Sequence, residues 1–433
     1  MNQSSILGNL PLIFRYEDAK ELGSHIVNRR SIVLIGIKRV GIGSFLSFFI
    51  NRKDVIKAYI QDPDDYLFIP VDMHDLIELE VAPFWSLTLK RIVDAVDSSR
   101  AREETKKEIR ELFLESIQLQ NLFFTIDSVR RSIKKIIDEG LMPTLFFIRF
   151  DRLKNSLTPE FFANLEGLRD STHQQLTYVF TSYLPFRRTF PNILTQATLS
   201  VLNKNVYLKP AKKEDRDLIF RSYKKRYEIK LSNELEKYFL NLVDGHFQYL
   251  HLGLISLHNP HREIITEEDL KKYLLNDEGI KLQSEELWEC LNQDEQKALI
   301  KIVSEKNIAR EEKFKTIYLW NVGFVKSEGK KLKIFSPLFS YYVKERILDK
   351  SKDSGAEFSK KELIFFEYLK KNLNEICERE RIIENVWSES SELGISDWAI
   401  DKLAARVRTK LKMQNNQYEL QTVKTRGFKL TEV

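Results

Sequence analysis

A glycine-rich segment near residue 40 has residue types that could bind a phosphate group. The run SIVLI (31–35) is apolar and rich in β-branched residues, and an apolar segment of helical length follows from Ile42. Between them, Gly36 and Gly41 have the G-x-x-x-x-G spacing. A strand, a turn and a helix in this order place backbone amides at a helix N-terminus, where they attract anions. The candidate nucleotide-binding residues are Gly36, Lys38, Arg39, Gly41, Gly43 and Ser44.

The loop lacks the lysine on which phosphate chemistry usually depends. In working loops of this spacing, Lys follows the second glycine and neutralises the β- and γ-phosphates, and the next residue is a Ser or Thr that binds magnesium. Here Ile42 and Gly43 hold these two positions, and Ser44 comes one place late. We therefore regard the loop as vestigial. Two alternatives stay open: a purely structural remnant, which we favour, and a loop that still binds ATP or ADP.

Residues from about 14 to 280 resemble the STAND class of AAA-related P-loop ATPases. Its loop reads G-x-R-R-x-G-K-T-S-L-L, which Gly36, Arg39, Gly41, Ser44 and Leu46 match. The resemblance implies a Walker B strand at LFFIRFDRL (145–153), where the class shows hhhDEhD.

Aligned on Asp151, the magnesium-organising Asp and the catalytic Glu of that motif are replaced by Ile148 and Arg149. Neither side chain can activate water or organise a divalent cation. We expect a pseudo-ATPase with no catalytic residues, no metal and no required cofactor.

The same resemblance implies two further sites. Thr181-Ser182 stands at the sensor position, and Asp244-Gly245-His246 is similar to the lid motif of the class. Phe247 replaces a proline that is common there, so we expect His246 to be a packing or capping residue.

The C-terminal segment has a concentrated positive charge. The segment SDWAIDKLAARVRTKLKM (396–413) predicts a helix with Ser396 as N-cap, and YELQTV and GFKLTEV predict a hairpin. From Lys402 to Leu430 there are eight basic residues and one acid, Glu419. Such a stripe is typical of a surface that follows DNA phosphates.

This segment resembles the winged helix of OmpR/PhoB-type response regulators. The matching residues are Ser396, Asp397, Ile400, Asp401, Arg408, Lys410, Leu411, Thr422, Val423, Gly427 and Phe428. The resemblance implies that 398–412 enters the major groove of duplex DNA and that the wing 422–428 contacts the minor groove. The candidate DNA-binding residues are Trp398, Lys402, Arg406, Arg408, Lys410, Thr422, Lys424, Thr425 and Arg426. This interpretation requires that the third helix does not pack inward and that its arginines are not neutralised by partners within the chain.

The pattern along the chain predicts a multidomain α/β plus α+β protein. Apolar runs at 66–73, 143–150 and 175–182 alternate with helical segments, including a charged helical region from about Trp85 to Gly140, which favours a parallel sheet. We predict a P-loop NTPase-like domain (1–206), a helical lid (207–280), a winged-helix-like spacer (281–348) and the terminal winged helix (357–433). In the spacer, Trp288, Phe314, Trp320 and Phe335 are expected in the core, although a second DNA contact there stays open.

Composition limits the protein class only broadly. A net charge of +6 in 433 residues is modest, and Cys290 and Cys377 lie far apart with no zinc-type spacing. No uncharged apolar stretch is long enough to span a membrane, so we expect a cytoplasmic protein.

The leading hypothesis is a sequence-specific regulator that binds double-stranded DNA, in which the degenerate ATPase module supplies homo-oligomerisation or signal input. The alternatives are a nucleotide-dependent DNA-associated assembly factor, for example in origin binding, transposition or anti-phage defence, and a protein-interaction hub. The sequence does not define the DNA site, activation or repression, the input signal or the oligomeric state.

Overall fold

The computed structural model describes residues 10–191, 193, 204–258, 264–329, 331–349, 358, 360–387, 397–414, 417–423 and 426–432. The chain forms two compact units. Unit 1 comprises 1–223, 244–248 and 317–326, and unit 2 comprises 224–243, 249–316 and 327–433. Each unit is described by itself.

Unit 1 is built on a five-stranded sheet in the order β2-β3-β4-β1-β5, in which all neighbours are parallel. Its strands are β1 (Ile32–Gly36), β2 (Tyr66–Asp72), β3 (Met142–Ile148), β4 (Thr177–Ser182) and β5 (Lys204–Leu208). Every residue of β1 and β4 is buried, as expected for central strands covered by helices on both faces. The predicted P-loop NTPase-like parallel sheet is confirmed.

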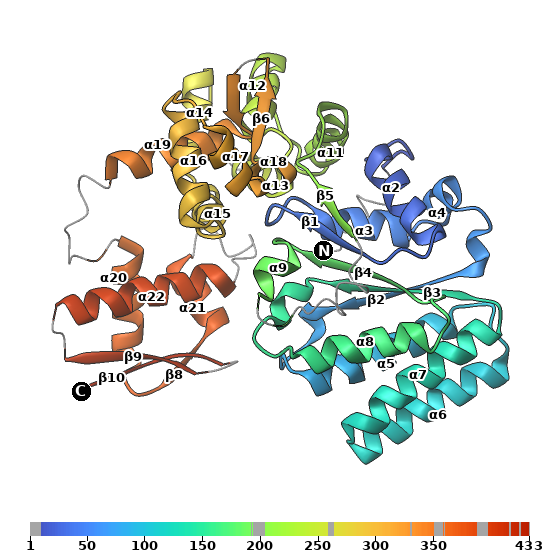
Figure 1. Ribbon diagram of the computed structural model, residues 1–433. Coiled ribbons are helices and arrows are strands. Elements are labelled where there is room, and N and C mark those ends of the chain that lie inside the picture. Colours follow the sequence, from blue (N-terminus) through green and yellow to red (C-terminus); the bar gives the residue numbers. More distant parts are fainter. Residues whose placement is uncertain are drawn as a thin grey trace. The chain divides into compact units, whose positions relative to one another are not determined.

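Helices cover both faces of this sheet, with α2, α3 and α4 on one side in Figure 1 and α5, α7 and α8 on the other. The helices of unit 1 are α2 (Tyr16–Val27), α3 (Ile42–Ile50), α4 (Lys53–Tyr59), α5 (Val81–Asp97), α6 (Glu103–Leu119), α7 (Leu122–Asp138), α8 (Pro159–Asp170) and α9 (Phe186–Thr189), and α11 (Lys213–Arg226) continues into unit 2. Short 3-10 turns are η1 (Pro63–Asp65), η2 (Met73–Asp75) and η3 (Phe150–Leu153).

The charged region that follows β2 forms three separate helices. Gln120 ends α6 in the left-handed conformation, at φ 48°. Asn121 then begins α7, because its side chain accepts a hydrogen bond from the amide of Phe124. On the same side of the sheet, aromatic rings form the core around Phe150, which contacts Phe147, Phe161, Phe180 and Phe186.

Unit 2 contains the helical region and the spacer. Its helices are α12 (Asn233–Val243), α13 (Phe247–His258, of which 247–248 belong to unit 1), α14 (Glu267–Asn276), α15 (Glu278–Glu289), α16 (Gln293–Val303), α17 (Arg310–Lys315) and α19 (Pro337–Asp349). The short helix α18 (Tyr318–Asn321) and part of β6 (Val325–Glu328) belong to unit 1, and β6 pairs with β7 (Lys331–Ile334).

One prediction for the spacer core is wrong. Trp288 and Phe335 are buried, and Trp320 is partly buried, but the side chain of Phe314 is 81% exposed. The sequence predicts one helix around Lys313–Val322, but the structure has two short helices, α17 and α18, separated by a turn at Thr316. Phe314 therefore lies on a six-residue helix with no buried residue.

The C-terminal part of unit 2 is a winged helix. It comprises α20 (Lys360–Lys371), β8 (Ile376–Glu378), α21 (Arg379–Val386), α22 (Asp397–Met413), β9 (Tyr418–Val423) and β10 (Gly427–Glu432), with the antiparallel strand order β8-β10-β9. Its core includes Phe365, Leu369, Ile382, Ile400, Leu403, Val407, Leu411 and Leu430.

The apolar pattern of 362–387, which includes Leu363 and Ile376, predicts two packed helices. The structure has the short strand β8 between them: α20 ends at Lys371, and Asn374 adopts φ 66° in the turn that leads to β8. Leu363 is 47% exposed and Ile376 is 41% exposed. Across all described residues, no helix is both long and apolar enough to cross a bilayer.

Candidate nucleic-acid interface and phosphate loop

The structure brings the six candidate nucleotide-binding residues together in the turn between β1 and α3. Gly41 has φ 102° and precedes the first helical residue, with no side chain capping the amides of α3. A Cβ on Gly36 would lie 2.7 Å from Cγ1 of Val40 and 2.9 Å from the carbonyl oxygen of Leu208, so this position tolerates only glycine. The turn therefore joins a buried strand to a helix N-terminus, as a phosphate loop does, but lacks the lysine.

Arg149 provides a positive charge beside this turn, in addition to Lys38 and Arg39 within it. It follows β3 directly at φ 57°, and its amide donates to Oγ1 of Thr181 at 2.6 Å. Its guanidinium donates from Nε to Oδ1 of Asp72 at 2.9 Å, and a second nitrogen pairs with Oδ2. A Cβ built on Gly43 would lie 3.6 Å from Nη1 of Arg149, which places the guanidinium beside the N-terminus of α3.

These residues do not fit a magnesium ion. The carboxylate of Asp72 is already paired with Arg149, and no group of three His, Cys, Asp or Glu side chains within the described ranges could hold a metal. Burial raises the pKa of Asp151 to about 6, although Lys38 and two arginines oppose the shift.

The lid motif packs directly on the phosphate loop inside unit 1. His246 is fully buried and its Nε2–H donates to the carbonyl oxygen of Lys38 at 2.9 Å. Burial lowers the pKa of His246 to about 4, so the ring is neutral near pH 7. A Cβ on Gly41 would lie 3.2 Å from Cβ of Phe247, the residue that replaces the usual proline. His246 is thus a packed residue that fixes the loop, as the sequence predicts.

In the winged helix, α22 packs on the core through five apolar residues whose spacing predicts the buried stripe of a helix. All five are buried: Ile400, Leu403, Ala404, Val407 and Leu411. Arg408 is directed toward the wing. Its Nε donates to the carbonyl oxygen of Leu420 at 2.9 Å, and Nη2 donates to Oγ1 of Thr422 at 2.9 Å. Arg408 therefore fixes α22 to β9 in addition to any contact with DNA.

Three other candidate cations of α22 have acidic partners within unit 2. Nη1 of Arg406 lies 3.0 Å from both carboxylate oxygens of Glu285, and its Nε lies 3.4 Å from Glu362. Lys402 pairs with Glu289, and Lys410 donates to Glu362 at 2.7 Å. The expectation that the helix arginines are not neutralised within the chain is therefore wrong for Arg406, whereas the two partners of Arg408 are uncharged.

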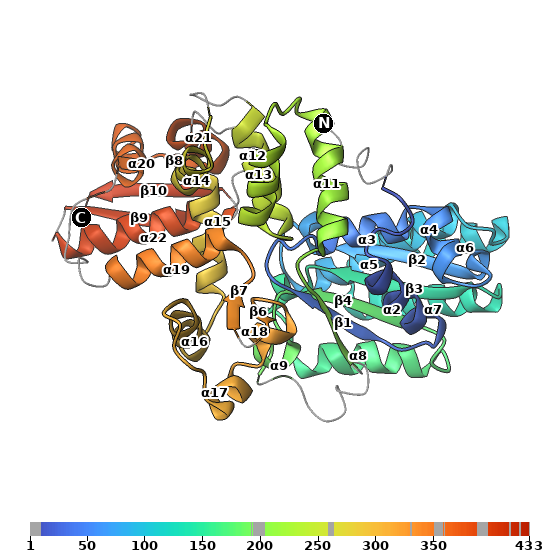
Figure 2. The ribbon, with the colours of Figure 1, turned by 90° about the horizontal axis from the view of Figure 1, so that it is seen from above.

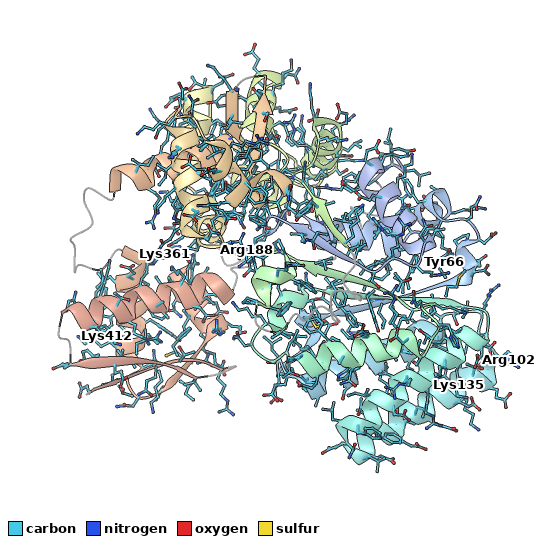
Figure 3. All side chains as sticks on the ribbon, in the orientation of Figure 1. Tyr66, Arg102, Lys135, Arg188, Lys361 and Lys412 are labelled. Carbon is cyan, nitrogen blue, oxygen red and sulfur yellow. The ribbon has the colours of Figure 1, made fainter. Side chains whose placement is uncertain are left out.

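The outer surface of the domain retains positive charge. Arg426, before β10, and Lys412, near the end of α22 and labelled in Figure 3, are exposed. Lys424, Thr425 and the side chain of Trp398 lie outside the described residues. Ser396, the predicted N-cap, lies outside them too, and α22 begins at Asp397.

Sequence reasoning missed Asp72, Glu285, Glu289 and Glu362, which determine the charge around both sites. Each is an ordinary acid in its local sequence. The one available signal was the spacing of Glu278, Glu285 and Glu289, which share a helix face and complement the basic C-terminal helix.

Residues 353–430 match the protein family described as "Transcriptional regulatory protein, C terminal", the OmpR/PhoB-type winged helix. No curated protein matches the chain. Among solved structures, the chain is similar to a Walker-type ATPase of Pyrococcus abyssi, with 15% identity over 77% of this chain and 96% of that one, at a TM-score of 0.48.

It is also similar to the Aeropyrum pernix ORC2 protein in ADPNP–ADP complexes, with 15% identity over 78% of this chain and 94% of that one, at a TM-score of 0.45. The Aeropyrum pernix ORC1 protein in complex with DNA matches with 11% identity over 96% and 88% of the two chains, at a TM-score of 0.34. The P-loop NTPase-like fold of unit 1 rests on its own strand order and on the loop between β1 and α3.

Proposed function

We propose that this chain is a sequence-specific transcriptional regulator that binds double-stranded DNA through α22 and the β9–β10 wing. The observation that carries this proposal is the match of 353–430 to the winged helix of transcriptional regulators, together with the packing of α22. The helix buries its apolar stripe in the core and is fixed to β9 by Arg408, so its remaining faces keep a defined orientation relative to the wing.

The charges on these faces suit DNA. Lys402, Arg406 and Lys410 recur at intervals of four residues and so form a single row along α22. Arg426 is exposed beside the wing, where the resemblance implies contact with the minor groove. Cations on a helix and an adjacent hairpin can contact a groove and the neighbouring phosphates together.

A binding measurement with the full chain tests this proposal. We expect a fluorescently labelled pool of random duplexes to bind at low salt, and Arg406→Ala/Arg426→Ala to weaken that binding. Lys237→Ala, which removes one exposed cation of α12, is the control and should bind like the wild type. If the wild-type chain fails to bind duplex DNA at low salt, the proposed function is wrong.

We further propose that unit 1 is a pseudo-ATPase that supplies oligomerisation or signal input in the cytoplasm. Ile42, Ile148 and Arg149 replace the groups that would hold phosphate and metal, which supports a non-catalytic module. One winged helix contacts few base pairs, so we expect a homo-oligomer on two half-sites roughly 10 base pairs apart. Sites selected from random DNA should contain both halves. A single unpaired half-site in the selected sequences would contradict dimeric binding.

The second candidate is an assembly factor controlled by a nucleotide. It is favoured by the turn at Gly36–Gly41, whose backbone keeps the shape of a phosphate loop. Calorimetric titration of the chain with ATP or ADP, without magnesium, distinguishes the two. Saturable binding with a change in oligomer size would support the assembly factor, and no binding would support the structural remnant.

A further inference from the structure

One face of α15 combines acids with a single leucine at helical spacing. Glu278, Leu282, Glu285 and Glu289 follow one another at intervals of four, three and four residues, so their side chains leave the helix on the same side. We call these four residues the acidic face of α15. In the views of Figures 1 and 2, α15 lies beside α22, and both helices belong to unit 2.

Each member of the acidic face contacts the winged helix. Glu278 pairs with Lys361 of α20, which Figure 3 labels, and Leu282 packs against the winged-helix core. Glu285 is within 3.0 Å of Arg406 through both carboxylate oxygens, and Glu289 pairs with Lys402. The contact therefore joins charge pairs to an apolar centre, as specific protein interfaces do.

The two cations held by Glu285 and Glu289 are candidate DNA contacts. The side chain of Glu285 is only 14% exposed, and that of Arg406 is 37% exposed. A guanidinium nitrogen that donates to Glu285 cannot donate to a phosphate in the same geometry. Carboxylates in that position would also repel the phosphate backbone.

We infer that the acidic face of α15 is an autoinhibitory surface that competes with DNA phosphates for the basic row of α22. This inference rests on the proposed function, because it concerns the regulation of the same DNA-binding surface. Lys402 and Arg406 of this row are bound either by α15 or by duplex DNA. The full chain is therefore a weaker DNA binder than its winged helix would allow, and any ligand or subunit contact that moves α15 activates it.

Charge-neutral variants of the acidic face test the competition. Glu285→Gln/Glu289→Gln preserves side-chain size but removes both charges from the contact. We expect the full-length variant to bind random-sequence duplex DNA on the order of fivefold more tightly than the wild type, within the range usual for coupling between sites.

The matched control is Glu234→Gln/Glu345→Gln, which changes the net charge equally at two exposed acids of α12 and α19. It measures the gain in DNA affinity that comes from the change in net charge alone. If the control gains as much affinity as the test variant, or if the test variant gains none, the inference is overturned.

Zero-length carbodiimide crosslinking monitors the contact without relying on affinity. It joins a lysine amine to a carboxylate in direct contact, so the free chain should yield Lys402–Glu289 and Lys361–Glu278 crosslinks, detected by mass spectrometry. We expect saturating duplex DNA to abolish the Lys402–Glu289 crosslink. The Lys106–Glu103 pair of α6 is an internal control and should be unaffected.

The results of these experiments distinguish a failure of the autoinhibition from a failure of the proposed function. If DNA binds and the Lys402–Glu289 crosslink persists in the complex, the autoinhibition is wrong while the proposed function stands. If the crosslinks form but neither the wild type nor Glu285→Gln/Glu289→Gln binds DNA, the proposed function is wrong. The autoinhibition is then wrong as well. Absence of the crosslinks in the free chain would also overturn the inference.

Discussion

The guanidinium of Arg149 lies against the carboxylate of Asp72, with Nε 2.9 Å from Oδ1, where the adjacent parallel strands β3 and β2 end. In the STAND-class ATPases that this part of the chain resembles, a catalytic glutamate occupies the position of Arg149. A cation therefore stands beside the phosphate loop, and it is paired with the carboxylate of Asp72. This arrangement supports the proposal that unit 1 is a non-catalytic module.

Restoring the missing loop lysine alone should not create an ATPase. Ile42→Lys would supply a cation at the first residue of α3, but Ile148 and Arg149 still provide no metal ligand and no base. We expect phosphate release from ATP by this variant, and by the wild type, to remain at the buffer rate in the presence of magnesium. Release above that rate by the wild-type chain, purified to constant specific activity, would contradict the pseudo-ATPase proposal.

Stability should depend on pH through His246. Burial lowers its pKa from 6.5 to about 4, so between these values the unfolded chain binds more protons than the folded one. The contribution of His246 to the free energy of unfolding should therefore fall as pH drops below 6.5, by about 2 kcal/mol at pH 5. Asp151 acts in the opposite direction, because its raised pKa of about 6 favours the folded state in acid.

Comparing variants isolates the histidine. His246→Asn keeps a donor for the carbonyl oxygen of Lys38 but does not titrate, so its urea unfolding should lose this part of the pH dependence. His173→Asn changes an exposed histidine and should behave like the wild type. An unaltered pH dependence in His246→Asn would show that His246 is not held neutral by burial.

Gly427 should be essential to the wing. A Cβ there would lie 1.9 Å from the carbonyl oxygen of Cys377, so Gly427→Ala must separate β10 from β8. We expect a loss of roughly 2–3 kcal/mol in the stability of the winged helix, visible as faster hydrogen exchange in β10. Gly167→Ala, in α8 with nothing within 4 Å of its Cβ, is the control. Unchanged protection of β10 in Gly427→Ala would refute this account of the close approach.

The sequence predicts the elements whose patterns are long and one-sided. Four strands of the sheet are continuous apolar runs, and the buried stripe of α22 recurs at helical spacing, so both were identified correctly. Strand β5 was missed because only Val206 and Leu208 of its five residues are buried. Strand β8 has three residues, too few for an alternating pattern to be recognised.

The acids that pair with the cations of α22 could not be predicted from the sequence, and the reason is different. Glu285 and Arg406 are 121 residues apart, and an acid in an amphipathic helix has many possible partners in an unfolded chain. Local charge density therefore identified the basic row of α22 but not the acids that cover it. Phe314 shows the converse error, since an aromatic residue was assumed to be core and is exposed.

The dependence of DNA affinity on salt tests the central claim most directly. For the full chain and a selected duplex, we expect log Kd to rise linearly with log salt concentration, with a slope that reflects several phosphate contacts. Arg426→Ala should weaken binding and reduce that slope by about 1. An affinity that does not change with salt, or a slope that Arg426→Ala leaves intact together with the affinity, would contradict DNA binding through the helix and wing.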